Sequence, residues 1–165
     1  MSKRLIWETP NLILFAPATP HIPREDGGHI CITTKEHYND RTCFDPKLAI
    51  EVMRLTMLSG EAYTAAMAEQ GISIARINYQ ENGNWAFLRH YNTANTPPYF
   101  HIHLYGRTEH SKTQPFGEAL YFPDPTEFDY HQFSLLTEED ITRIREHCSM
   151  LSETPKYDLK TWGLA

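Results

Sequence analysis

The pattern of apolar and polar positions along the chain predicts short strands separated by turns. Runs rich in β-branched and aromatic residues are bounded by glycine, proline, asparagine or aspartate, which is typical of strands in an antiparallel sheet. Residues 20–28 form a turn-rich loop, and the turn at 81–84 favours a hairpin in which the following segment pairs back. The predicted strands are residues 11–17, 29–35, 72–80, 85–91, 97–107 and 118–122.

Two segments show helical spacing instead. Asp45 and Pro46 form a helix start, because aspartate caps free N–H groups and proline fits the first helical position. Apolar residues then recur at helical spacing until Gly71, and a second helix is predicted over 136–151 with Thr137 as its cap. The apolar positions are Leu48, Val52, Leu55, Ala62 and Ala66 in the first helix and Ile141, Ile144, Cys148 and Leu151 in the second. Strands around one long helix, with a C-terminal helix, predict an α+β fold with a mainly antiparallel sheet.

Length and composition fit one soluble domain over residues 1–165. Of the 165 residues, 41% are hydrophobic and 22% are charged, which suits a globular protein with a sizeable core. No apolar run approaches the roughly 18–20 residues that span a bilayer. Residues 1–15 lack the apolar core and the cleavage site of a signal peptide. We therefore expect a cytoplasmic protein that does not enter membranes.

Charge and cysteine content exclude further classes. The formal charge of −6 argues against broad nucleic-acid binding, which usually needs a basic surface. A few local donors are still enough to bind one small phosphorylated molecule. The three cysteines, Cys31, Cys43 and Cys148, are widely spaced and predict neither a disulfide framework nor a CxxC metal site. Cys31 lies in an apolar strand pattern, where we expect a core residue.

The segment 97–107 carries two histidines one residue apart. Because side chains alternate along a strand, His101 and His103 share one face. Tyr99 and Tyr105 flank them on that face, and the apolar residues between them are expected to pack on the core. An imidazole can act near neutral pH as a nucleophile, an acid or a base. On this pair alone, incidental packing, a metal clamp and a catalytic pair all stay open.

A second segment favours the catalytic interpretation. The stretch "GGHICITTKEH" at 27–37 places His29 after two glycines and at the start of a strand pattern. Together with "YFHIHLYGR" it resembles the histidine-triad (HIT) family, in which a G-H-φ-φ-φ-x-x-K-x-H segment precedes an H-φ-H-φ-H-φ-φ strand. The order of the predicted elements is similar to that of the family. The resemblance covers about residues 10–108 and implies a HIT-like fold, with 109–165 as a C-terminal extension.

The resemblance implies roles for four residues around the triad. His101 matches the middle histidine, which is the nucleophile of the family. His103 matches the last histidine and is expected to contact phosphate or the leaving group. Tyr99 stands in place of the first histidine, and a tyrosine forms hydrogen bonds but cannot become an imidazolium. His29 matches the histidine after glycine and would support the triad; core packing is an equal alternative.

The resemblance also implies four substrate-binding positions. His21 falls near the place where many members carry an aspartate or asparagine that contacts ribose. Asn82 matches an asparagine–glycine turn, while Asn95 and Thr96 lie at the spacing of a Gln-Ser pair before the triad strand. These residue types are also common in ordinary turns. The interval between Asn82 and the triad is longer than usual, which predicts an insertion at 85–92 that reshapes the pocket.

The leading prediction is a HIT-like nucleotide hydrolase or nucleotidyl transferase. His101 would attack the α-phosphorus of a nucleoside phosphate derivative, and water would resolve the covalent nucleotidyl-histidine. His103 and nearby backbone N–H groups would stabilise charge and protonate the leaving group. The chemistry needs no cofactor and no protein-bound metal, and the expected partner is a small nucleotide or another phosphorylated molecule. The resemblance further implies a homodimer to which the long helix and a strand edge contribute.

Two other functions stay open. One is a non-catalytic nucleotide-binding protein or interaction protein on the same fold, since Tyr99 stands in place of a triad histidine and His21 lies near the position that contacts ribose in the family. The other is a metal-dependent enzyme in which His101 and His103 hold an ion, as in cupins. Against this second alternative, Glu109 lies one residue beyond the usual spacing, and Asn95 stands where that motif has glycine.

Overall fold

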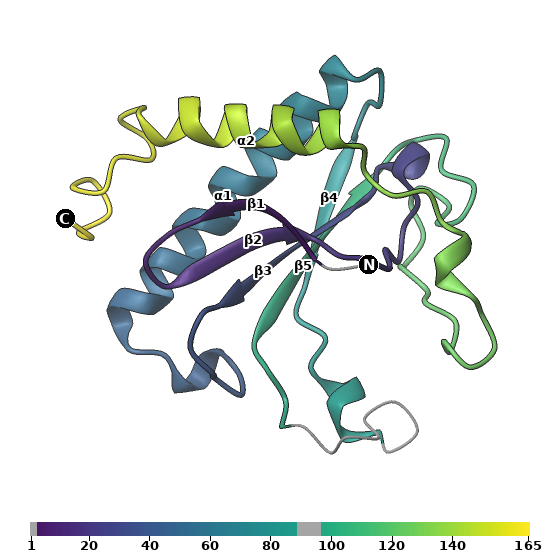
Figure 1. Ribbon diagram of the computed structural model, residues 1–165, viewed down its shortest axis with the longest axis horizontal. Helices are drawn as coiled ribbons and strands as arrows, with labels where there is room; N and C mark the ends of the chain where they lie inside the picture. The colour runs from purple at the N-terminus through teal and green to yellow at the C-terminus, as the bar shows by residue number, and fades with distance from the viewer. Residues whose placement is uncertain (1–2, 89–96) are drawn as a thin grey trace.

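One five-stranded antiparallel sheet organises the protein. A computed structural model describes residues 3–88 and 97–165 (Figure 1). The strands are β1 (Arg4–Glu8), β2 (Leu12–Ala16), β3 (His29–Thr34), β4 (Arg76–Gln80) and β5 (His101–Arg107), in the sheet order β1-β2-β3-β5-β4. The helices are α1 (Pro46–Glu69) and α2 (Glu138–Ser152), with short 3-10 helices at Arg24–Asp26, Arg41–Cys43, Asn84–Phe87 and Tyr130–Gln132. Within these described residues, no helix has both the length and the apolar character that a membrane crossing requires.

Both long helices form where the sequence predicts them. The Asp45 side chain accepts a hydrogen bond from the Leu48 N–H at 2.8 Å, and Pro46 is the first helical residue. In α2, Thr137 caps the helix and exchanges hydrogen bonds with Asp140. The predicted apolar stripe of α1 is buried, and it joins α2 and the sheet in one core. The α+β prediction is therefore confirmed.

The strand prediction is wrong at three places: one strand was missed, and two strands were predicted where the described residues form none. Strand β1 was not predicted; it is short and partly polar, and Arg145 of α2 donates hydrogen bonds to two of its carbonyls. The predicted strand at 85–91 is wrong where the structure describes it, because Asn84–Phe87 form a 3-10 helix. The predicted strand at 118–122 is also wrong. There the Gln114 side chain bonds both main-chain groups of Tyr121, at 2.7 Å and 3.0 Å, in place of a neighbouring strand.

The loop between β2 and β3 packs directly on the end of β5. The Gly106 N–H donates to the Gly28 carbonyl at 3.1 Å. A Cβ on Gly27 would lie 2.5 Å from the carbonyl carbon of Gly106, and Gly27 has a φ of +122°. Glycine is therefore required on this loop, which carries His21 toward β5.

The C-terminal extension holds the same loop from its other side (Figure 1). The buried Asp26 carboxylate accepts hydrogen bonds from the Lys112 N–H at 3.0 Å and from the Thr113 N–H and hydroxyl, both at 2.7 Å. Arg24 forms two hydrogen bonds, at 2.6 Å and 2.8 Å, with the fully buried carboxylate of Asp140 in α2. The position of the β2–β3 loop thus depends on residues more than eighty positions further along the chain.

Candidate active site

The neighbouring strands β3 and β5 bring the two resembling segments together. In their antiparallel register His29 lies opposite Tyr105, Cys31 opposite His103, and Thr33 opposite His101. The other face of β5 packs into the core as the alternation predicts, through the buried residues Phe100, Ile102 and Leu104. The histidines are therefore backed by a rigid, buried strand pair.

Tyr99 lies just before β5, and its hydroxyl and its main-chain carbonyl contact different parts of the site. Its hydroxyl is within hydrogen-bond distance of three main-chain carbonyls at the end of β3 and just beyond it, those of Thr34 (2.8 Å), Lys35 (3.1 Å) and Glu36 (3.0 Å). Its own carbonyl lies 2.8 Å from Nδ1 of His101. The tyrosine hydroxyl thus anchors the segment before β5 to the loop after β3, while the main chain of Tyr99 contacts the candidate nucleophile.

The contact with Tyr99 fixes the tautomer of His101. A carbonyl oxygen only accepts hydrogen bonds, so Nδ1 of His101 must carry the proton. In the neutral ring, Nε2 then keeps its lone pair. His101 is partly exposed and lines a cavity of about 420 Å³. The lone pair therefore belongs to a side chain that a small molecule can reach, as a nucleophile requires.

Contacts from the loop after β3 hold the Tyr99 carbonyl in place. The main-chain N–H of Phe100 donates to the Tyr38 carbonyl at 2.8 Å. Nε2 of His37 lies 2.9 Å from the Pro98 carbonyl, which makes that nitrogen the donor. His37, the last histidine of the first segment, is exposed and stabilises the chain before β5.

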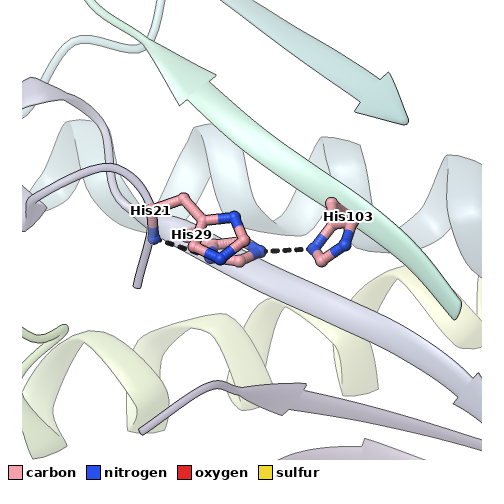
Figure 2. A group of neighbouring side chains, drawn as sticks. All are labelled: His21, His29 and His103. Atoms are coloured by element: carbon pink, nitrogen blue, oxygen red, sulfur yellow. Dashed lines mark hydrogen bonds between the residues drawn. The ribbon is translucent and has the colours of Figure 1, made fainter. Parts of the chain in front are cut away.

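Three other histidines form a cluster beside His101. Nε2 of His29 lies 2.8 Å from Nδ1 of His103, and the main-chain N–H of His21 donates to Nδ1 of His29 at 3.2 Å (Figure 2). Nδ1 of His21 lies 2.9 Å from the Tyr105 hydroxyl. One ring nitrogen from each of the three histidines lies within 4.8 Å of the others. Among the described residues, this is the one group whose ligand atoms lie close enough together to bind a single metal ion.

Burial keeps this cluster uncharged near neutral pH. Desolvation, followed by repulsion from His101, lowers the pKa of His21 to about 4. Desolvation, with repulsion from His101 and then His21, lowers the pKa of His103 to about 2. The fully buried His29 has its pKa lowered well below the usual value, again mainly by desolvation. Burial raises the pKa of the Cys31 thiol, whose sulfur lies 3.1 Å from Nε2 of His29.

The walls of the cavity come from segments that are far apart in sequence. Asn82 lines it as predicted, and its amide donates to Gln80 at 3.2 Å. His21 also lines it, with its ring 5.2 Å from that of Phe122 and 5.7 Å from that of Trp85. The predicted substrate residues Asn95 and Thr96 lie outside the described residues. Trp85 belongs to the segment 85–92 that the sequence predicts to reshape the pocket, and it lines the cavity. The lining residues that sequence reasoning missed include Gln80, Asn84, Leu120 and Phe122.

The sequence contains a signal for only some of the missed residues. Leu120 and Phe122 belong to the apolar run "EALYF" at 118–122, which we interpreted as a strand. They lie in the C-terminal extension, which the HIT motif does not cover. The extension thus forms one wall of the candidate site, and no spacing rule connects it with the triad.

Comparisons with known proteins identify the fold. No protein-family model matches the sequence, and no curated protein matches it. A hypothetical histidine triad nucleotide-binding protein from Sulfolobus tokodaii matches with a TM-score of 0.58 and 14% identity, over 94% of this chain and 90% of that one. A Hit-like protein involved in cell-cycle regulation from Bartonella henselae matches with a TM-score of 0.54 and 18% identity, over 89% and 88%. A uridylyltransferase matches with a TM-score of 0.53 and 17% identity, over 91% of this chain and 42% of that one.

These similarities establish the architecture. The chain has a HIT-like fold, as the two histidine segments predicted. At identities this low, the roles of individual residues rest on the geometry of this chain.

Proposed function

We propose that the protein is a HIT-type nucleotide hydrolase or nucleotidyl transferase that works through a covalent nucleotidyl-His101 intermediate. The observation that carries this proposal is the 2.8 Å contact between Nδ1 of His101 and the Tyr99 carbonyl, which leaves Nε2 free to attack. The similar structures named as nucleotide-binding protein and uridylyltransferase support nucleotide chemistry on this fold.

The reaction follows from the two nitrogens of His101. Nε2 forms a bond to the α-phosphorus, and the bond from phosphorus to the leaving group breaks with its electron pair. The ring gains positive charge, which the Tyr99 carbonyl stabilises through Nδ1–H. Water, or an acceptor hydroxyl in a transferase, then forms a P–O bond at the same phosphorus, the P–N bond breaks with its electron pair returning to Nε2 of His101, and the proton of the attacking group passes to solvent. His103 lines the cavity, where its ring provides a hydrogen bond to the phosphoryl group.

The substitution His101→Ala tests the nucleophile. We expect the hydrolysis of adenosine phosphoramidate and of dinucleoside polyphosphates to fall roughly a thousandfold or more, as is common when a nucleophile is removed. Mass spectrometry of the native protein after a brief reaction should show one added nucleotidyl group, absent from the variant. His110→Ala, at an exposed position outside the cavity lining, is the matched control. Unchanged turnover in His101→Ala would overturn the assignment. Nucleotide binding without turnover by the native protein would favour the non-catalytic alternative.

We also propose that the protein forms a homodimer through the edge strand β4 and the exposed side of α1. The predicted stripe of α1 is occupied by the core, but Met53 and Met57 on its other side are 52% and 39% exposed. Tyr79 of β4 is 47% exposed, and the three residues border an apolar groove of about 540 Å³. Light scattering should give a dimer for the native protein and a monomer for Met57→Glu. Met150→Glu on α2 is the control, since Met150 is 57% exposed away from this groove.

A further inference from the structure

The cavity beside His101 has an uncharged wall. Of the described residues that line it, none is a lysine, arginine, aspartate or glutamate. His21 in the same lining is neutral near neutral pH, because burial, more than repulsion from His101, lowers its pKa to about 4. A charged polyphosphate chain is normally bound by arginine, lysine or a metal ion. The part of a ligand that lies against this wall is therefore expected to be uncharged.

Two aromatic side chains belong to this wall and contact the same ring. The ring centroid of Trp85 lies 5.7 Å from that of His21, and the ring centroid of Phe122 lies 5.2 Å from it. Phe122 also packs against Tyr105 of β5, with 4.8 Å between the two centroids. Trp85 follows β4 in the chain, whereas Phe122 comes from the C-terminal extension. Two distant segments thus each bring one large ring to the cavity.

Hydrogen bonds on both sides of Phe122 hold its main chain at the cavity. The Gln114 side chain bonds both main-chain groups of Tyr121, at 2.7 Å and 3.0 Å. The Tyr130 hydroxyl donates to the Pro123 carbonyl at 2.8 Å. Neighbouring side chains alternate along this segment, since Tyr121 is 72% exposed while Phe122 lines the cavity. The aromatic surface of Phe122 is therefore in place before a ligand binds.

Two side-chain amides lie in the same lining. Gln80 ends β4, and Asn84 begins the 3-10 helix that follows. The Gln80 oxygen accepts a hydrogen bond from Asn82 at 3.2 Å. Within residues 3–88 and 97–165, no group bonds the Gln80 nitrogen or the Asn84 amide. An amide can pair with a neighbouring donor and acceptor on the edge of a base, so these groups are left to read a ligand.

We propose that Trp85 and Phe122 form a stacking site for the nucleobase of the substrate, and that Gln80 and Asn84 bind the edge of the base. This inference rests on the proposed function, since it takes a nucleotide as the ligand. A base is planar and uncharged, and it presents donors and acceptors only along its edge. Aromatic rings with neutral amides beside them match these properties. A phosphate chain lacks a cationic partner here, and a sugar lacks a flat face to stack.

Both rings lie outside the two histidine segments that carry the family resemblance. Phe122 is in the extension beyond residue 108, and Trp85 is in the longer interval before the triad strand. Selection of the base is therefore assigned to segments that are particular to this chain. The histidine segments supply the phosphoryl chemistry, and the added segments supply the contact with the base.

Binding of two simple ligands tests the stacking site without turnover. Isothermal titration of the native protein should give an affinity for adenosine monophosphate roughly tenfold or more above that for ribose 5-phosphate, which lacks the base. Equal affinities would overturn the stacking site and leave the proposed function standing, because His101 would still contact the phosphoryl group. A clear preference for the base in a native protein that turns over no nucleotide would overturn the enzymatic function alone.

Matched substitutions assign the preference to the two rings. Phe122→Leu and Trp85→Leu should each weaken the binding of adenosine monophosphate roughly tenfold and leave that of ribose 5-phosphate unchanged. Tyr121→Leu and Phe87→Leu are the controls, since each removes a ring that is more than 70% exposed and does not line the cavity. An equal loss for both ligands in the tested variants would indicate a purely structural role, and no loss would show that neither ring contacts the base. Either result would overturn the proposal.

A change in the edge of the base tests the amides. Purine ribonucleoside monophosphate keeps the flat ring of adenosine monophosphate but lacks its exocyclic amino group. The native protein should bind it roughly tenfold more weakly, as expected when one base-edge contact is lost. The double variant Gln80→Leu with Asn84→Leu should bind the two nucleotides with similar affinity. A tenfold difference that persists in the double variant would show that other groups read the edge, and the role of the amides would be refuted.

Discussion

The burial of three neutral histidines predicts that stability falls steeply in mild acid. In the unfolded chain each imidazole has a pKa near 6.5. In the folded chain, mainly through desolvation, the pKa of His21 is about 4, that of His103 is about 2, and that of His29 is well below the usual value. Below a pH of about 6.5 the unfolded chain therefore binds more protons than the folded one. The stability is fully present above this pH and is lost as the pH falls toward the lowered values.

The size of the effect follows from the same pKa values. One histidine that is protonated only in the unfolded chain changes the free energy of unfolding by about 1.4 kcal/mol per pH unit. Between about pH 7.5 and about pH 5.5, each of the three contributes about 1.4 kcal/mol, because the unfolded pKa lies inside this interval. The total is about 4 kcal/mol at most, since part of the His21 ring remains exposed. This is a large share of the 5–15 kcal/mol that is typical of a folded domain.

Urea unfolding at these two pH values and constant ionic strength measures the loss. His29→Gln should reduce the pH-dependent part by about 1.4 kcal/mol, because one of the three groups no longer titrates. His110→Gln, at an exposed position, should leave that part unchanged. Asp26 and Asp140 do not interfere, because hydrogen bonds outweigh their burial and place each pKa below the ordinary carboxyl value. A total loss below about 1 kcal/mol would show that the histidines accept protons inside the fold, and the reasoning would fail.

Two further predictions concern the supports of the site. Asp140→Asn should lower the free energy of unfolding by about 2–3 kcal/mol in urea titrations, because it leaves the Arg24 guanidinium without its buried partner. A loss under about 0.5 kcal/mol would show that the ion pair between Arg24 and Asp140 does not stabilise the fold. Tyr99→Phe should lower stability by about 1 kcal/mol, as for one lost hydrogen bond, and should reduce kcat more than it changes KM. Steady-state kinetics with kcat unchanged would show that the anchor does not control His101.

Local signals in the sequence were enough to predict most of the helices and strands. The cap at Asp45 and the spacing of the apolar residues in α1 depend only on neighbours in sequence, so the helix was predicted closely. The alternation around His101 likewise predicted which side chains of β5 enter the core. The wrong strand at 118–122 has a tertiary cause. Its aromatic and apolar residues have high strand propensity, but Leu120 and Phe122 line the cavity.

The candidate site was predicted only where a motif covers it. The spacing of two histidine segments placed His29, His101 and His103 together, and the structure brings them together. The direction of their hydrogen bonds was not predictable, because it depends on the main-chain N–H of His21. The hydrogen bonds of the Tyr99 hydroxyl could not be predicted either, because their acceptors are carbonyls more than sixty residues earlier in the chain. Such contacts follow from tertiary packing and leave no periodic signal.

The ties between the β2–β3 loop and the C-terminal extension set an order of events during synthesis. The ribosome adds His21 and His29 early in synthesis. The residues that hold their loop are added much later: Thr113 bonds Asp26, and Asp140 bonds Arg24. Because domains emerge from the N-terminus first, the strands are able to pair before the site is assembled. A nascent chain arrested before α2 should therefore contain the sheet without a competent cavity. The ability to bind a nucleotide would then appear only near the end of translation.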